Sequence, residues 1–253
     1  MLIKSKSLKG YKINAMDADI GRVKEFFFDD RFWTIRYLVV ETGNWFNSKQ
    51  VLISPYFIQT VDYESELVNV NLTKQQVADS PAYDSDLPVS RQYEEEYTIY
   101  YGTPYYWGST NMWGSYPYII RDRELWKRDE NKENSWNPNL RSSKEVLDYD
   151  FQAIDGEIGH VDDFIINDDT WTIRYLVLDT KSWLPGRKVL ISTEWIDRIS
   201  YDESKVFVDL SRETIRNVPE YNEDEVLTRE HENVLHQHFN RQGYWVDTPA
   251  YSH

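Results

Sequence analysis

The sequence predicts a mainly β fold: two tandem small antiparallel β-barrels, each followed by an α-helix, related by internal duplication. The segment Trp-Thr-Ile-Arg-Tyr-Leu-Val occurs at residues 33–39 and again at 171–177, an offset of 171 minus 33, or 138 residues. The same offset aligns the two halves without a gap. Each half also contains short apolar runs separated by turn residues, a pattern typical of antiparallel strands.

The offset sets the boundaries of the expected domains. It places Ile20-Gly21 on Ile158-Gly159 and continues as far as the Tyr-Trp pairs at 106–107 and 244–245. This period is too long for a solenoid repeat, so each copy is a duplicated domain. We expect repeat one with its helix at residues 1–107. An aromatic and polar linker follows at 108–138, and repeat two with its helix and a tail occupies 139–253.

The elements of repeat one follow in order along the chain. Residues 17–21 carry the Asp and Gly of a tight connection, and alternation over 35–39 predicts a strand. Further strands are expected at 51–53, 57–61 and 68–72. A single open sheet of this size would expose its edges, so we expect closed barrels over 5–84 and 143–222.

A helix is expected after each barrel, near residues 87–100 and 225–239. In repeat two, Val226, Leu227, Val234, Leu235 and Phe239 give an apolar helical face. The preceding residues Asn222, Glu223 and Asp224 suit a helix N-terminus, so they are expected to cap it.

Three strings in repeat two carry a resemblance to a known family. They are Asp-Gly-Glu-Ile-Gly-His-Val-Asp-Asp-Phe at 155–164, Trp-Thr-Ile-Arg-Tyr-Leu-Val-Leu-Asp-Thr at 171–180 and Trp-Leu-Pro-Gly-Arg-Lys-Val-Leu-Ile-Ser at 183–192. Together they resemble the PRC-barrel family, which includes the cytoplasmic domain of the photosynthetic reaction-centre H subunit and a domain of a ribosome maturation factor. The resemblance implies a small β-barrel that docks to a partner and does not catalyse a reaction.

Composition and charge exclude several classes of function. The chain contains no cysteine, which excludes disulfides, zinc-thiolate sites and thiol nucleophiles. The net charge of −15 argues against nucleic-acid binding, which depends on Lys and Arg. From residue 143 onward, 23 acidic residues face 11 basic ones, a net −12. We interpret this excess as a solvated acidic face that could steer a basic protein partner.

The sequence also contains no long apolar run and no early hydrophobic segment. These patterns predict a cytoplasmic protein that does not insert directly into a membrane.

No catalytic motif is present, so we expect no enzyme activity, cofactor or metal. His231, His236 and His238 cluster on the expected helix of repeat two. Their counterparts in repeat one are aromatic or hydroxyl residues, which makes a metal site the weaker interpretation.

Two arginines lie mid-strand at equivalent positions, Arg36 and Arg174. A charge there needs a partner if it is even partly buried. A structural ion pair is favoured over a ligand-binding arginine, and the candidate carboxylates are Asp17 and Asp155, or alternatively Asp30 and Asp168.

Large aromatic residues follow each expected helix. They bury considerable area when they pack, so we expect the linker to be ordered and to hold the barrels together, with binding to a partner as the alternative. The candidate interaction residues are Tyr105, Tyr106, Trp107, Trp113, Tyr244 and Trp245.

The leading functional hypothesis is a non-catalytic docking or scaffold protein whose partner is not identified by the sequence. The first alternative is a cytoplasmic enzyme or small-ligand sensor, with a site between the barrels lined by linker aromatics and Arg36 or Arg174. The second is an accessory to photosynthetic electron transfer, by analogy with the H subunit alone. The sequence is also compatible with a homodimer.

Overall fold

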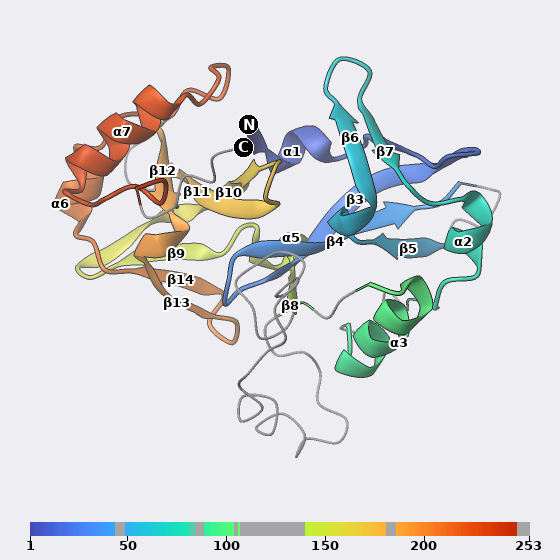
Figure 1. Ribbon diagram of the computed structural model, residues 1–253. Helices are drawn as coiled ribbons and strands as arrows, with labels where there is room; N and C mark the ends of the chain where they lie inside the picture. The colour runs from blue at the N-terminus through green and yellow to red at the C-terminus, as the bar shows by residue number, and fades with distance from the viewer. Residues whose placement is uncertain are drawn as a thin grey trace. The chain divides into compact units, whose positions relative to one another are not determined.

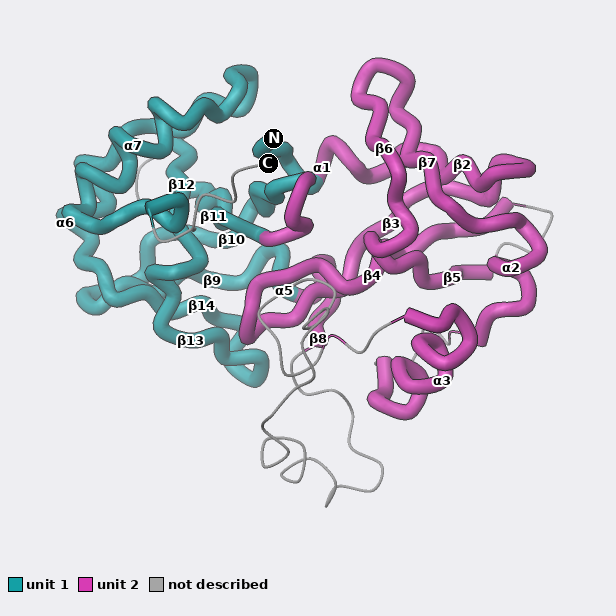
Figure 2. Tube along the Cα trace, viewed as in Figure 1, with its two compact units in different colours: residues 1–5, 146–168, 173–253 teal, residues 6–145, 169–172 magenta. Residues whose placement is uncertain are grey.

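A computed structural model describes residues 1–43, 49–81, 83, 89–103, 106, 140–180 and 186–246 (Figure 1). The chain forms two compact units (Figure 2). Unit 1 contains residues 1–5, 146–168 and 173–253, and unit 2 contains residues 6–145 and 169–172. Unit 1 therefore holds most of repeat two, and unit 2 holds most of repeat one.

The sheet of unit 2 has the strand order β5-β4-β3-β2-β7-β6. Neighbouring strands are antiparallel except β2 and β7, which are parallel. The strands are β2 (Lys12–Asn14), β3 (Asp19–Asp29), β4 (Thr34–Glu41), β5 (Gln50–Ile53), β6 (Ile58–Asp62) and β7 (Leu67–Val70). A 3-10 helix, η2 (Pro55–Phe57), precedes β6, and helices α2 (Lys74–Ala78) and α3 (Arg91–Tyr101) follow β7.

The sheet of unit 1 repeats this order as β12-β11-β10-β9-β14-β13, with β9 and β14 parallel. The strands are β9 (Asp150–Ala153), β10 (Gly156–Asn167), β11 (Thr172–Asp179), β12 (Lys188–Ser192), β13 (Ile196–Ser200) and β14 (Lys205–Val208). Its helices are η3 (Thr193–Trp195), α6 (Arg212–Arg216) and α7 (Arg229–His238). The shared order confirms the mainly β prediction and the internal duplication.

One pair of glycines explains the Ile-Gly motif found in both repeats. Gly21 and Gly159 have φ angles of +150° and +137°. A Cβ atom at these positions would lie 2.2 Å from the carbonyl oxygen of Glu41 and 2.0 Å from that of Asp179. Only glycine lets these strands approach so closely.

The first strand of each repeat belongs to the unit formed by the other repeat. β1 (Leu2–Lys4) pairs with β10 in unit 1, and β8 (Leu140–Ser142) pairs with β3 in unit 2. The expected barrels begin at residues 5 and 143, so they omit both strands. The compact units consequently differ from the repeat boundaries at 1–107 and 139–253, and the linker at 108–138 lies outside the described residues.

Short helices follow these exchanged strands, α1 (Ser5–Leu8) and α5 (Ser143–Val146). The helices expected near 87–100 and 225–239 correspond to α3 and α7, which begin later than expected. The expected cap of α7 was wrong: Thr228 caps it by accepting a hydrogen bond from the His231 amide. The Asn222 side chain instead accepts a hydrogen bond from the Asp224 amide, which forms a local turn.

The core of unit 2 shows how the helix and the exchanged strand join the sheet. Phe27, Tyr37, Val39 and Leu52 from the sheet are buried with Val89, Tyr97, Tyr106 and Leu140. Leu140 comes from the exchanged strand β8 and is 6% exposed. Within the described part of the chain, no helix is long and apolar enough to cross a bilayer.

Candidate functional site

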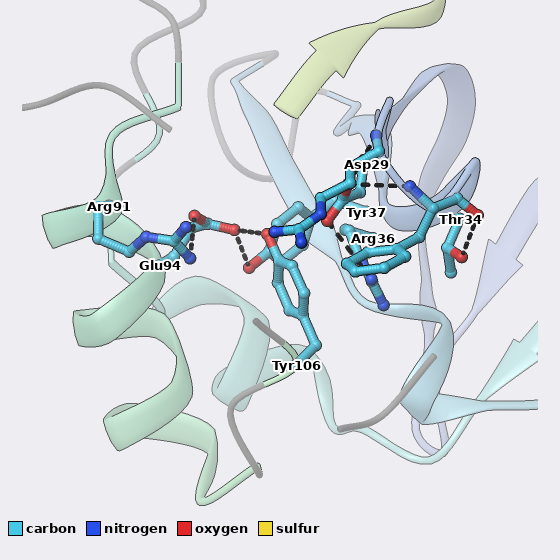
Figure 3. Close-up of polar contacts among 9 residues, drawn as sticks. Asp29, Thr34, Arg36, Tyr37, Arg91, Glu94 and Tyr106 are labelled. Atoms are coloured by element: carbon cyan, nitrogen blue, oxygen red, sulfur yellow. Dashed lines mark hydrogen bonds and ion pairs between the residues drawn. The ribbon is translucent and has the colours of Figure 1, made fainter. Parts of the chain in front are cut away.

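A buried carboxylate anchors helix α3 to the sheet of unit 2. We call its surroundings the Glu94 cluster, which comprises Arg36 and Tyr37 from β4, Arg91 and Glu94 from α3, and Tyr106 beyond α3 (Figure 3). The Glu94 side chain is 0% exposed. A carboxylate this deep requires hydrogen-bond or ionic partners, because burial removes its hydration.

The partners of Glu94 come from three segments. The Tyr106 hydroxyl donates a short hydrogen bond to Oε1 of Glu94. The Tyr37 hydroxyl donates to the same oxygen over 3.4 Å. Oε2 lies 3.3 Å from a terminal nitrogen of Arg91. The carboxylate thus ties the helix to β4 and to the segment that follows the helix.

Arg36 completes the Glu94 cluster on the side of Tyr106. Its guanidinium carbon lies 4.0 Å from the centre of the Tyr106 ring, and a terminal nitrogen lies 3.5 Å from Oδ2 of Asp29. Arg36 is 3% exposed. Asp29 is held in place because its Oδ1 accepts the backbone amides of Arg31 and Phe32.

The structure gives Arg36 a different partner from those named in the sequence analysis. The Asp17 carboxylate accepts the Lys74 amide at 2.8 Å, at the start of α2. Asp30 pairs with Arg141 of β8 at 3.6 Å. Sequence spacing alone did not show that the neighbouring Asp29, at the end of β3, faces Arg36 on β4.

Repeat two contains an equivalent arrangement, the Glu232 cluster, which comprises Arg174, Tyr175, Arg229, Glu232 and Tyr244. The Tyr175 and Tyr244 hydroxyls donate to Oε1 of Glu232 at 2.8 and 2.9 Å. Oε2 lies 2.9 Å from a terminal nitrogen of Arg229. The guanidinium carbon of Arg174 lies 3.9 Å from the centre of the Tyr244 ring. Every member is the counterpart of a Glu94-cluster residue at the offset of 138.

His236 extends the Glu232 cluster. Its Nδ1 donates to the backbone oxygen of Gln242 at 2.9 Å, and its Nε2 lies 3.1 Å from the Tyr175 hydroxyl. Burial lowers the pKa of His236 below its usual 6.5. Burial therefore disfavours the charged form of this ring.

The other two histidines of α7 also have partners within the protein. Nδ1 of His231 accepts the Thr228 amide, and Nε2 of His238 lies 3.0 Å from the Thr214 carbonyl. Among the described residues, no three His, Asp or Glu side chains lie together as a metal-binding group.

Arg174 differs from Arg36 in its surroundings. The position of Asp29 is taken by Asn167 in repeat two. Asp155 accepts the Arg212 amide at the start of α6, and Asp168 pairs with the amino group of Met1. Arg174 is only half-buried, and burial lowers its pKa. Its buried Nε has no hydrogen-bond partner in the described chain.

The tyrosines of both clusters are held in the protonated form. Burial, followed by the charge of Glu94, raises the pKa of Tyr37 and Tyr106 well above 10. Burial and Glu232 raise the pKa of Tyr175 in the same way. Protonated hydroxyls are the donors that a buried carboxylate needs. The arrangement therefore positions a helix through charge-assisted hydrogen bonds.

The candidate interaction residues fall into two groups. Tyr106 is buried, and Tyr244 and Trp245 are half-buried against the Glu232 cluster. The Trp245 ring lies 4.9 Å from His236 and 4.2 Å from the Arg229 guanidinium carbon. The remaining candidates, Tyr105, Trp107 and Trp113, lie outside the described residues.

Sequence reasoning missed the two central carboxylates, although a signal for them existed. Arg and Glu occur three residues apart in both repeats, as Arg91 with Glu94 and Arg229 with Glu232. This spacing places both side chains on one helical face. Their retention at the same offset as the strand tyrosines indicates a shared contact.

A second equivalent feature lies on the surface, at the turn after β2 and β9. We call residues 16–19 and 154–157 the turn surfaces. Met16 is 59% exposed and Ile154 is 68% exposed. Their backbone amides donate to the carbonyls of Leu72 and Leu210, which fixes both turns.

Comparison with known proteins identifies the part of each repeat that precedes helices α3 and α7. A family model described as the PRC-barrel domain matches residues 2–77 and 144–215, one segment in each repeat. No curated protein matches the chain.

Proposed function

The chain belongs to the PRC-barrel domain family, and from that premise we propose that it is a non-catalytic docking or scaffold protein that binds a basic protein partner in the cytoplasm. The turn surfaces are the sites that we assign to this partner. The proposal is supported by their chemistry, by the way the helices are fixed, and by the distribution of charge.

The observation that carries the proposal is the repeated pairing of an exposed apolar side chain with exposed acids. Met16 stands beside the exposed Asp17 and Asp19. Ile154 stands beside the exposed Asp155 and Glu157. An apolar contact surrounded by acids suits a protein segment that offers an apolar residue among Lys or Arg.

The Asp residues of the turn surfaces also support a docking role through their position. Asp17 and Asp155 each accept the first amide of the following helix, α2 or α6. These hydrogen bonds fix the turns before any partner arrives. A preformed surface loses less conformational entropy on binding than a mobile one.

The buried charges support a structural role for the rest of each repeat. Glu94 and Glu232 are fully occupied by tyrosine hydroxyls and an arginine. Such groups hold a helix on a sheet, as a scaffold requires. The net −12 from residue 143 onward adds long-range attraction for a basic partner.

The test compares three forms of the full chain as bait in a lysate of cells that naturally contain it. They are the unsubstituted chain, the double variant Met16→Ser/Ile154→Ser, and the control Ile99→Ser. Ile99 lies on α3 and is 72% exposed, so it matches the test residues in exposure but lies outside the turns.

A basic protein retained by the unsubstituted chain and by the control, but lost by the double variant, is the expected result. Its elution should require only moderate salt, because exposed charges contribute to the contact. Equal capture of every bound protein by all three baits would refute the turn surfaces as the docking sites.

A second candidate function, a small-anion sensor, is favoured by one observation at Arg174. This guanidinium is half-buried, and Asn167 stands where its counterpart has the aspartate Asp29, so the acidic charges that act on it are those of Glu194 and Glu232. Inorganic phosphate and citrate are suitable probes. Stabilisation of the unsubstituted chain by either anion, with loss in Arg174→Met, would support this candidate, and equal melting curves would exclude it.

A further inference from the structure

We propose that the edges of β3 and β10 that receive an exchanged strand form a self-recognition site, which binds the first strand of a repeat from a second copy of this chain. Within one chain the two repeats already fill each other's sites. The inference is independent of the turn surfaces.

The acceptor edge is a defined stretch of a long strand. β2 pairs with the first part of β3, at residues 19–22, and β8 pairs with the last part, at residues 27–29. β4 already covers residues 27–29 on the other side of β3. Without β8, the backbone groups of this stretch would form an open sheet edge, which readily pairs with another chain.

The two acceptor edges are equivalent in register. Leu140, Arg141 and Ser142 lie opposite Asp29, Phe28 and Phe27. Leu2, Ile3 and Lys4 lie opposite Asn167, Ile166 and Ile165. Every donor and every acceptor in the first set matches its counterpart at the offset of 138. Either edge therefore presents the same backbone pattern to an incoming first strand.

Side chains at both sites add polar recognition. In unit 1, the Ser5 hydroxyl donates to Oδ1 of the buried Asp163 at 2.5 Å. In unit 2, the Ser142 hydroxyl donates a short hydrogen bond to Glu25, and the Ser143 hydroxyl accepts the Phe26 amide at 3.2 Å. An acid of the acceptor strand thus meets a serine of the donor segment at both sites.

An ion pair joins each donor segment to the acceptor unit, from Met1 ahead of β1 and from Arg141 in the middle of β8. Asp168 pairs with the amino group of Met1, and its counterpart Asp30 pairs with Arg141. Apolar contacts complete the site, since Ile3 and Leu140 are buried. The matching partner is therefore a short strand with an apolar residue, a following serine and a positive charge, which is the first strand of this repeat.

The path of the chain permits a second copy to supply this strand. The unit boundaries fall after Ser5 and after Glu145, inside the short helices α1 and α5. Each donor strand is thus joined directly to its own repeat. The linker at 108–138 is not needed for either pairing. Two repeats on separate chains can make the same reciprocal contacts, which is the geometry of an isologous dimer.

The test uses the full chain with engineered cysteines and a protease site placed in the linker. The native chain has no cysteine, so the introduced thiols have no competitors. Leu2→Cys/Asn167→Cys and Leu140→Cys/Asp29→Cys join residues opposite one another across the exchanged strands. The control, Leu2→Cys/Asp29→Cys, joins the residues that would be opposite without exchange.

After oxidation and cleavage, both exchange pairs should link the two fragments on a non-reducing gel, and the control, whose two cysteines lie in the first fragment, should keep both thiols free. The Asp29 substitution is shared by one test variant and the control, so misfolding cannot account for a difference between them. Linkage inside one fragment in the control, or fragments that separate in both test variants, would overturn the exchanged arrangement.

The second copy is tested by recombination. Tagged and untagged forms of the intact Leu2→Cys/Asn167→Cys chain are mixed under reducing conditions, unfolded and refolded together, and oxidised, and the linker is cleaved only afterwards. A measurable share of the tagged first fragments should then carry an untagged second fragment. Recovery of fragments only with their original partners would show that the site does not accept a second copy, and would refute the proposal.

Discussion

The Glu94 and Glu232 clusters consist of five equivalent side chains but differ at their borders. In repeat one, Arg36 has Asp29 as an ionic partner, and α3 carries Thr98 one turn after Glu94. In repeat two, Asn167 occupies the position of Asp29, and His236 occupies the position of Thr98. The hydroxyl of Thr98 donates to the helix backbone, whereas His236 contacts Tyr175.

The comparison distinguishes residues that the fold requires in both repeats from residues that are specific to one repeat. The carboxylate with its two tyrosines and an arginine is present in both repeats, and it fixes a helix in both. We expect these border residues to set how each repeat responds to pH and to anions. Repeat two, with a half-exposed Arg174 and a buried His236, is the half in which we expect the larger response.

Removal of the central carboxylate is expected to have the largest effect. Glu94→Ala and Glu232→Ala leave buried tyrosine hydroxyls and an arginine without their acceptor. Each should lower the free energy of unfolding by about 3–5 kcal/mol, as loss of one partner of a buried charge pair does. Denaturant titration followed by tryptophan fluorescence measures this change.

The exposed neighbours Glu95 and Glu230 provide controls on the same helices. Glu95→Ala and Glu230→Ala should change the free energy of unfolding by less than about 0.5 kcal/mol. A comparable loss from the exposed and the buried substitution would mean that helix propensity, and not the cluster, accounts for the effect.

The two close-approach glycines come next. Gly21→Ala and Gly159→Ala place a methyl group against a carbonyl oxygen of the neighbouring strand. Each should cost about 1–3 kcal/mol in unfolding free energy, a typical cost of overpacking. Gly43→Ala is the control, since its Cβ meets nothing within 4 Å. If only one repeat is sensitive, the two sheets are not equivalent at this point.

Much of the fold is readable from the sequence because strands and repeats leave local patterns. Alternation at 35–39 and the ungapped offset predict the sheets and their duplication. The clusters are harder to predict, since Glu94 resembles any solvated helical glutamate until its tyrosine partners are known. Strand exchange leaves no pattern at all. Nothing in residues 2–4 assigns them to one acceptor edge, because both edges have the same register.

A pH titration sharpens the comparison between Thr98 and His236. The folded state lowers the pKa of His236 below 6.5 through burial, so it prefers the neutral ring. Unit 1 should therefore have its full stability above pH 6.5 and lose stability as the pH falls below that value. Hydrogen exchange of α7 should show the loss, and α3 should not share it. His236→Thr should remove this pH dependence, and a dependence that persists in this variant would assign it to other groups.

The smallest expected effect concerns the missing partner of Arg174. Asn167→Asp restores the residue that stands beside Arg36 in repeat one, so it should raise the free energy of unfolding. The gain should be only about 0.2–1 kcal/mol, because Arg174 is half-exposed and water screens the pair.

A double-mutant cycle with Arg174→Met isolates this pairing from other effects of the new carboxylate. The gain should vanish in the Arg174→Met background. A gain that remains there would show that the aspartate acts elsewhere, for example on the β1 strand opposite residue 167. The same substitution should also abolish any stabilisation by phosphate or citrate, since an internal carboxylate would occupy the guanidinium that an external anion needs.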